Sequence, residues 1–113
     1  MGLAASQARF LSLTARKSDI EFKGQQVNQE RTQNAYTMAD LVSTLTNDPT
    51  MENTDPTKYN LIENQITLAQ SIDRNLELDL KNVDTQHNEV QTEIDSVKKV
   101  IDKNVDMTFK TFA

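Results

Sequence analysis

The chain has 113 residues, no cysteine, 36% hydrophobic residues and a net charge of −5. A hydrophobic fraction below the roughly 45–50% of globular domains argues against a large compact core, and the lack of cysteine excludes disulfides and thiolate metal sites. Seventeen acidic against twelve basic residues argue against nucleic-acid binding, which needs clustered cations. Two glycines and two prolines leave little turn chemistry, so we expect few, long elements.

The first predicted element is a helix from about Leu3 to Thr46, with apolar ends and a polar middle. Two seven-residue ladders run along it: Leu3, Phe10, Lys17, Gly24, Arg31, Met38 and Leu45, and then Leu13, Ile20, Val27, Asn34 and Leu41. Gly24 costs about 1 kcal/mol of helix propensity relative to alanine. We interpret residues 24–34 as a kink, a polar wall or a segment ordered only on assembly.

A turn of about residues 47–55 follows, and the two prolines of the chain, Pro49 and Pro56, mark its position. Proline blocks helix continuation, while Asn, Asp and Thr favour turns and caps. Asn47 is the expected stop of the first helix. Asp55 has the features of an N-cap, with Pro56 at the first helical position. A connection this short favours antiparallel helices.

The second predicted helix runs from about Pro56 to Thr108 and carries an apolar seam. Spacings of four and three residues alternate along this seam, as in a coiled coil: Leu76, Leu80, Val83, His87, Val90, Ile94, Val97 and Ile101. The start of the helix has a wider apolar face, formed by Leu61, Ile62, Ile66, Leu68, Ala69 and Ile72. A face of this width favours contact with two neighbours rather than one.

These elements predict an all-α fold: one domain over residues 1–113, a long antiparallel helical hairpin that forms oligomers. A rod two helices thick gives each helix one partner, and the polar middle of the first helix makes the seam too continuous for that helix to cover alone. We therefore expect neighbouring copies to cover the rest. The predicted assembly interface comprises the seam together with Leu3, Phe10, Leu13, Phe109 and Phe112.

Few residues suggest chemistry, and each has a simpler interpretation. His87 is the only histidine, and a lone polar residue in a seam more often sets register than acts as a pH switch. Glu89 and Glu93 lie one helical turn apart, which is typical of a solvated charged face. We predict no catalytic residue, no cofactor and no metal site, and hence a protein that is not an enzyme.

The N-terminal segment leaves membrane contact open. Residues 1–6 match the loose N-myristoylation pattern at Gly2, and Arg9, Arg16 and Lys17 suit an amphipathic surface helix. Assembly with copies of the same chain is the favoured interpretation of this segment. Its residues lack the order of a cleaved secretory signal, so we expect any export to leave the chain uncleaved.

The single break at Asn47-Asp48-Pro49 and Asp55-Pro56, the polar start and the apolar end together resemble the helical-hairpin subunits of type III secretion needles and of flagellar rods and filament cores. The resemblance implies coaxial packing of terminal helices into a hollow tube and export without a cleaved signal. It predicts a structural subunit of a bacterial filament or tube, extracellular or at the cell surface. The alternative is a non-enzymatic coiled-coil adaptor, chaperone or basal-body component that forms a closed oligomer, with a cytoplasmic location also open.

Overall fold

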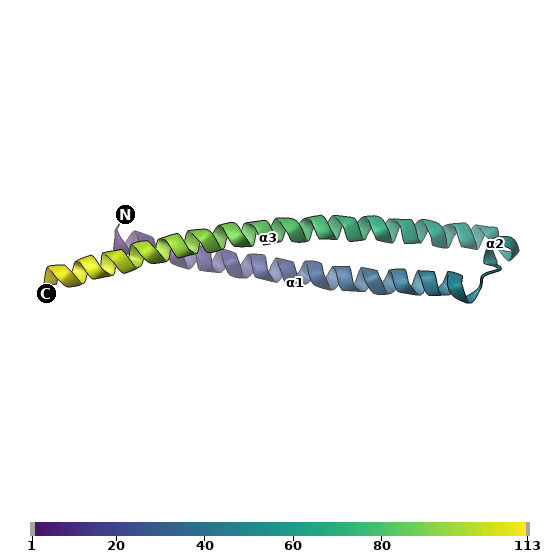
Figure 1. Cartoon of the computed structure of the whole chain (residues 1–113), viewed down its shortest axis with the longest axis horizontal. Helices are drawn as coiled ribbons and strands as arrows, with labels where there is room; N and C mark the ends of the chain where they lie inside the picture. The colour runs from purple at the N-terminus through teal and green to yellow at the C-terminus, as the bar shows by residue number, and fades with distance from the viewer. Residues whose placement is uncertain (1, 113) are drawn as a thin grey trace. The chain divides into compact units, whose positions relative to one another are not determined.

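The computed structural model describes residues 2–112, apart from the side chain of Phe112, and this part of the chain is helical with no strand. Helix α1 spans Leu3–Asn47, the single-turn helix α2 spans Met51–Thr54, and helix α3 spans Pro56–Phe112 (Figure 1). The predicted all-α fold with two long helices is confirmed. The predicted turn contains α2, and α3 continues four residues beyond the predicted end near residue 108.

The helix ends follow the predicted caps. The backbone N–H of Lys58 donates to Asp55 Oδ1 at 3.1 Å, so the aspartate caps α3 and Pro56 occupies the first helical position. Proline fits there because its missing N–H would have no partner within the helix. Helix α1 ends at Asn47, as expected. The buried side chain of Met51 anchors the turn.

The chain forms two compact units, and both long helices contribute to each. Unit 1 combines the described residues of Met1–Gly24 with those of Asn82–Ala113, and unit 2 is Gln25–Lys81. Unit 2 contains four basic and nine acidic residues, whereas unit 1 contains eight of each. The net charge of −5 therefore belongs to unit 2.

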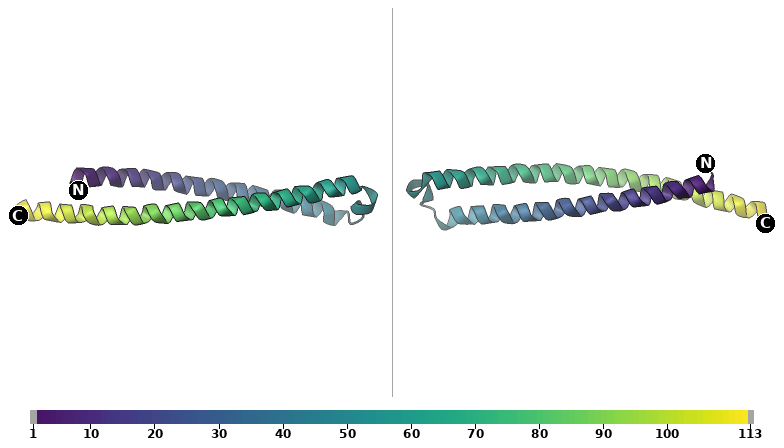
Figure 2. Two further views of the ribbon diagram at one scale, coloured as in Figure 1. Left: turned by 90° about the horizontal axis from the view of Figure 1, so that it is seen from above. Right: turned by 180° about the vertical axis from the view of Figure 1, so that it is seen from behind.

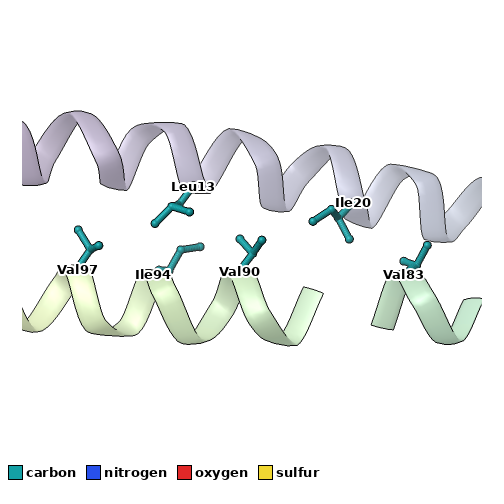
Figure 3. Close-up of a cluster of buried hydrophobic side chains, with 6 residues drawn as sticks. All are labelled: Leu13, Ile20, Val83, Val90, Ile94 and Val97. Atoms are coloured by element: carbon teal, nitrogen blue, oxygen red, sulfur yellow. The ribbon is translucent and has the colours of Figure 1, made fainter. Parts of the chain in front are cut away.

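In unit 1, the start of α1 packs antiparallel against the C-terminal part of α3 (Figure 2). Leu13 and Ile20 of α1 point toward the apolar side chains of α3 (Figure 3), and the buried cluster comprises Leu13, Ile20, Val83, Val90, Ile94 and Val97. Phe10 and Ile101 pack against this cluster and are partly buried. The predicted seam is therefore the α3 side of a core formed with α1.

Unit 2 is a helical hairpin closed by α2 (Figure 1). Its buried apolar residues are Val27, Met51, Ile62, Ala69 and Leu76, and Leu80 is half-buried. Arg31 and Asn34, at ladder positions of α1, are half-buried and bond to α3. The polar middle of α1 therefore packs against α3 through polar contacts.

Helix α1 covers most of the seam in both units, although Leu80, His87 and Ile101 remain half-buried. Cover of these three residues by neighbouring copies stays a prediction. Leu76 in unit 2 and Val83 in unit 1 are buried within one chain. Two features of α1 make this possible: polar side chains reach α3, and glycine allows a close approach. A Cβ built at Gly24 would lie 3.3 Å from Cγ1 of Val83, and α1 continues through Gly24 as one helix.

Ser6 provides a test of this core. Its side chain is buried, and its Oγ has no hydrogen-bond partner. We expect Ser6→Ala to raise the free energy of unfolding by about 1–2 kcal/mol, because it removes an unsatisfied hydroxyl and increases helix propensity. Urea unfolding measures this, with exposed Ser12→Ala as the matched control that changes helix propensity alone, by about 0.5 kcal/mol. An equal gain in both variants would contradict the burial of an unpaired hydroxyl.

Gly24 provides a second test. In a Val83→Ala background, Gly24→Ala should gain the full helix propensity of about 1 kcal/mol. With Val83 present the gain should fall below half of that, because the new methyl group would meet Cγ1 at 3.3 Å and the valine must shift. A double-mutant cycle in urea measures the difference. Equal gains in the two backgrounds would show that the helices do not approach closely at this point.

Candidate assembly surface

Most residues of the predicted assembly interface lie in the core between α1 and α3. Seven of them are buried or partly buried in unit 1 by apolar contacts, and Leu3, Leu76 and Leu80 are also covered within the chain. Phe109 is different, since it is 76% exposed. Phe112 was also predicted, but its side chain lies outside the described residues. Contact of these core residues with neighbouring copies stays a prediction.

His87 is half-buried at its seam position and faces a carboxylate of α1. Its Nε2 lies 3.0 Å from Oε1 of Glu21, and Nζ of Lys17 lies 4.0 Å from the same oxygen. The histidine side chain remains 34% exposed, so water reaches the pair. This geometry places a polar contact between the helices within an otherwise apolar seam. The role of His87 in setting register stays a prediction.

A second polar layer lies in unit 2. Nε of Arg31 donates to Oδ1 of Asp73 at 2.9 Å. Nη2 of the same arginine lies 3.9 Å from Oε2 of Glu77. The hydrogen bond and charge of Asp73 raise the pKa of Arg31, so the guanidinium stays protonated. Asn34 Nδ2 donates to the backbone oxygen of Ala69 at 2.7 Å. A slipped register between the helices would separate these groups, so this layer favours the observed alignment.

Two surface hollows contain carboxylate groups, the side chains in this chain most suited to acid–base or metal chemistry. An open groove of about 570 Å³ is lined by Ala35, Met38, Ala39, Val42, Ser43, Thr46, Asn47 and Asp73. The carboxylate of Asp73 in this groove already accepts the hydrogen bond of Arg31. The second hollow contains Glu89 and Glu93, and Glu93 is paired with Arg9 at 2.9 Å. Within the described residues, no cluster of three His, Cys, Asp or Glu side chains could hold a metal ion.

The wide apolar face at the start of α3 divides into a buried and an exposed part. Ile62, Ile66 and Ala69 are buried or half-buried. Beside them lies the α3 column, an exposed row without charged residues, spaced by four, three, four and three: Leu61, Gln65, Leu68, Ile72 and Asn75. This row has the spacing of a coiled-coil seam. Helix α1 is thus one neighbour of this face, and contact of the exposed row with a second neighbour stays a prediction.

A matching row lies on α1 in unit 1, and the hydrophobic pattern did not reveal it. The α1 column has the same alternation of four and three and comprises Ala4, Ala8, Leu11, Ala15, Ser18 and Phe22, all exposed. Alanine and serine contribute little to an apolar pattern, so only Leu11 and Phe22 stand out. The informative signal is the absence of charge at six exposed positions of one helix face, which usually carries charged side chains.

The end of α3 adds a third exposed apolar surface. Val105, Met107 and Phe109 are exposed in unit 1, and they follow Asn104, the last half-buried residue among the described side chains of α3. These three side chains are therefore not covered by the described residues of α1, and the expectation that the segment packs against a partner stays a prediction. The three surfaces are the candidate assembly surface of the chain.

Comparison with known proteins gave no match to a family model, a curated protein or a solved structure. Within the described residues, no helix has the length and apolar character needed to cross a membrane. The assignment of function therefore depends on the geometry of the two units.

The polar layer of unit 2 can be tested by substitution. Asp73→Ala should lower the urea midpoint of unfolding, because Arg31 then lacks its short hydrogen bond. Replacing both Arg31 and Asp73 with leucine should restore or exceed the original midpoint, since half-buried ion pairs are often no more stabilising than apolar packing. Glu93→Ala, which breaks a more exposed pair, is the control and should have little effect. Equal effects of Asp73→Ala and Glu93→Ala would contradict this assignment.

Proposed function

We propose that this chain is a non-enzymatic structural subunit that assembles with copies of itself into a helical filament or tube. The observation that carries the proposal is the α3 column, a coiled-coil row that remains exposed after the seam has been buried by α1. Leu68, at its centre, is 61% exposed. A row of this kind gains stability when another helix covers it.

The core of each unit is narrow. Two helices bury one row each, so the apolar area removed from water is small for the number of ordered residues. Full burial of a leucine or isoleucine side chain contributes roughly 1.5–3 kcal/mol. Leu61, Leu68 and Ile72 are 56%, 61% and 40% exposed, so covering them would add about half of such a contribution for each residue at a contact between copies.

The resemblance to secretion-needle and flagellar rod subunits supports a filament outside the cell or at its surface. A closed coiled-coil oligomer, as in an adaptor, chaperone or basal-body component, is the second candidate. The observation that favours it is the strict heptad spacing of both helices, which is also typical of small bundles. The two candidates differ in whether the assembly stops growing.

Sedimentation velocity and electron microscopy of the chain over a rising concentration series test the proposal. We expect particles that lengthen with concentration, because contacts between different surfaces of a subunit do not close unless the rotation permits it. A fixed small mass would support the closed oligomer instead. A folded monomer at the highest concentration would overturn self-assembly altogether.

The C-terminal segment gives a more specific prediction. Phe109→Asp should weaken assembly without changing the urea midpoint, because the side chain is exposed in the single chain and an unpaired charge at a contact is unfavourable. Lys110→Gln is the control, since it changes the net charge by the same amount at the neighbouring residue. Light scattering against concentration measures both variants. Equal behaviour would show that Phe109 makes no contact between copies.

A further inference from the structure

We propose that the α3 column pairs with the α3 column of a second copy of this chain, with the two helices antiparallel. The contact is isologous, because the same residues of unit 2 contribute from both subunits. This inference rests on the proposed self-assembly and identifies its first contact. An isologous contact closes after two copies, so a filament requires a further contact, for which the α1 column and the end of α3 remain exposed.

Opposite charges lie at the two ends of the α3 column. The alternation of three and four residues continues for one position beyond each end, to Lys58 before Leu61 and to Asp79 after Asn75. Both charged side chains are exposed. The row therefore runs from a cation through five uncharged positions to an anion, and reversing the direction of the helix exchanges the two charges.

These two charges select the relative direction of the paired helices. An antiparallel pair centred on Leu68 brings Lys58 of each copy beside Asp79 of the other, so opposite charges meet at both ends of the contact. A parallel pair would place lysine beside lysine at one end and aspartate beside aspartate at the other. Like charges side by side at an interface are unfavourable, and complementary charges fix its alignment. The charges at the ends therefore favour the antiparallel pair.

The other charged residues in this part of α3 lie away from the column. They are Glu63, Asp73, Arg74 and Glu77. With 3.6 residues per turn, each of them lies about 120° or more around the helix from the centre of the column. The contact would therefore cover three half-exposed apolar side chains from each copy without burying a charge.

The net charge of −5 on unit 2 opposes the approach of two copies at long range. At about 0.15 M salt the Debye length is about 8 Å. Salt at this concentration screens the repulsion between the distant charges of the two units, whereas the lysine and aspartate at each end of the contact lie side by side. Association is therefore best measured at this ionic strength.

Thiol cross-linking tests the direction of pairing, because the native chain contains no cysteine. Leu61→Cys mixed with Asn75→Cys should cross-link with a short bis-maleimide, since an antiparallel pair centred on Leu68 places these positions opposite each other. Each variant alone should cross-link little, because its two thiols would lie about 21 Å apart along the helix at 1.5 Å per residue. The reverse result would show a parallel pair and overturn the proposal. Ser96→Cys, at an exposed position outside the column, is the control for random collision.

Charge reversal tests the role of the two ends. Lys58→Glu should raise the dissociation constant about tenfold, because it places two carboxylates side by side at both ends of the contact. This residue lies in the first turn of α3, where a carboxylate stabilises the helix, so weaker association would not reflect unfolding. The double variant Lys58→Glu/Asp79→Lys should return the constant to near its native value.

Arg74→Glu is the matched control for Lys58→Glu, since it changes the net charge by the same amount at an exposed position away from the column. Sedimentation equilibrium measures all of these variants. Equal effects of Lys58→Glu and Arg74→Glu, or a double variant as weak as Lys58→Glu alone, would overturn the antiparallel pairing.

A second matched pair tests the apolar part of the column. Leu68→Asp should raise the dissociation constant about tenfold or more, because the contact would bury an unpaired charge. Leu78→Asp is the control, since Leu78 is 57% exposed on the same helix, compared with 61% for Leu68, and lies outside the column. The urea midpoint of each variant shows that the single chain remains folded.

The outcomes separate this inference from the proposed function. If the native chain associates but Leu68→Asp and Leu78→Asp behave alike, the pairing of columns is wrong while self-assembly stands. If Leu68→Asp weakens association but the mixture of cysteine variants does not cross-link, another surface covers the column, and the self-pairing is overturned. If the native chain stays monomeric, both the pairing and the proposed function fail.

Discussion

The central physical constraint on this chain is the burial of one apolar row of α3 against one row of α1. The core is a single layer of side chains between two helices, and the cluster from Leu13 to Val97 forms it in unit 1. Every other feature must be compatible with this contact. The polar layer of Arg31, Asn34 and Asp73 interrupts the row without opening it, because each polar group reaches a partner on the other helix or beside it.

A core one layer thick also determines what remains outside. Positions next to the buried row face neither the core nor the far side of the helix, and in most coiled coils charged residues occupy them. Here Leu61, Leu68 and Ile72 occupy such positions in unit 2. The α1 column lies on an exposed face of unit 1 that is equally free of charge. Uncharged exposed rows in both units are the physical basis of the proposal that the chain associates with copies of itself.

Much of the fold could be predicted from the sequence. The seven-residue ladders predicted which residues of α1 and α3 form the core, and Asp55-Pro56 predicted the start of α3 from capping chemistry alone. The short turn predicted that α1 would face the seam, but the extent of that cover could not be predicted, because periodicity does not reveal that polar side chains and a glycine allow the polar middle of α1 to pack against α3. Helix α2 was missed because four residues are too few to show a period. The α1 column was missed because alanine and serine produce no apolar contrast.

The division into two units has a consequence for the order of folding. Unit 2 contains the turn, so its helices meet after a short loop is closed, whereas the two segments of unit 1 are separated in sequence by all of residues 25–81. Loop closure becomes entropically more costly as the loop lengthens, so we expect the pairing of α1 with α3 to begin at the turn and to reach unit 1 last. The last segment of the hairpin to form is therefore the one that displays the α1 column.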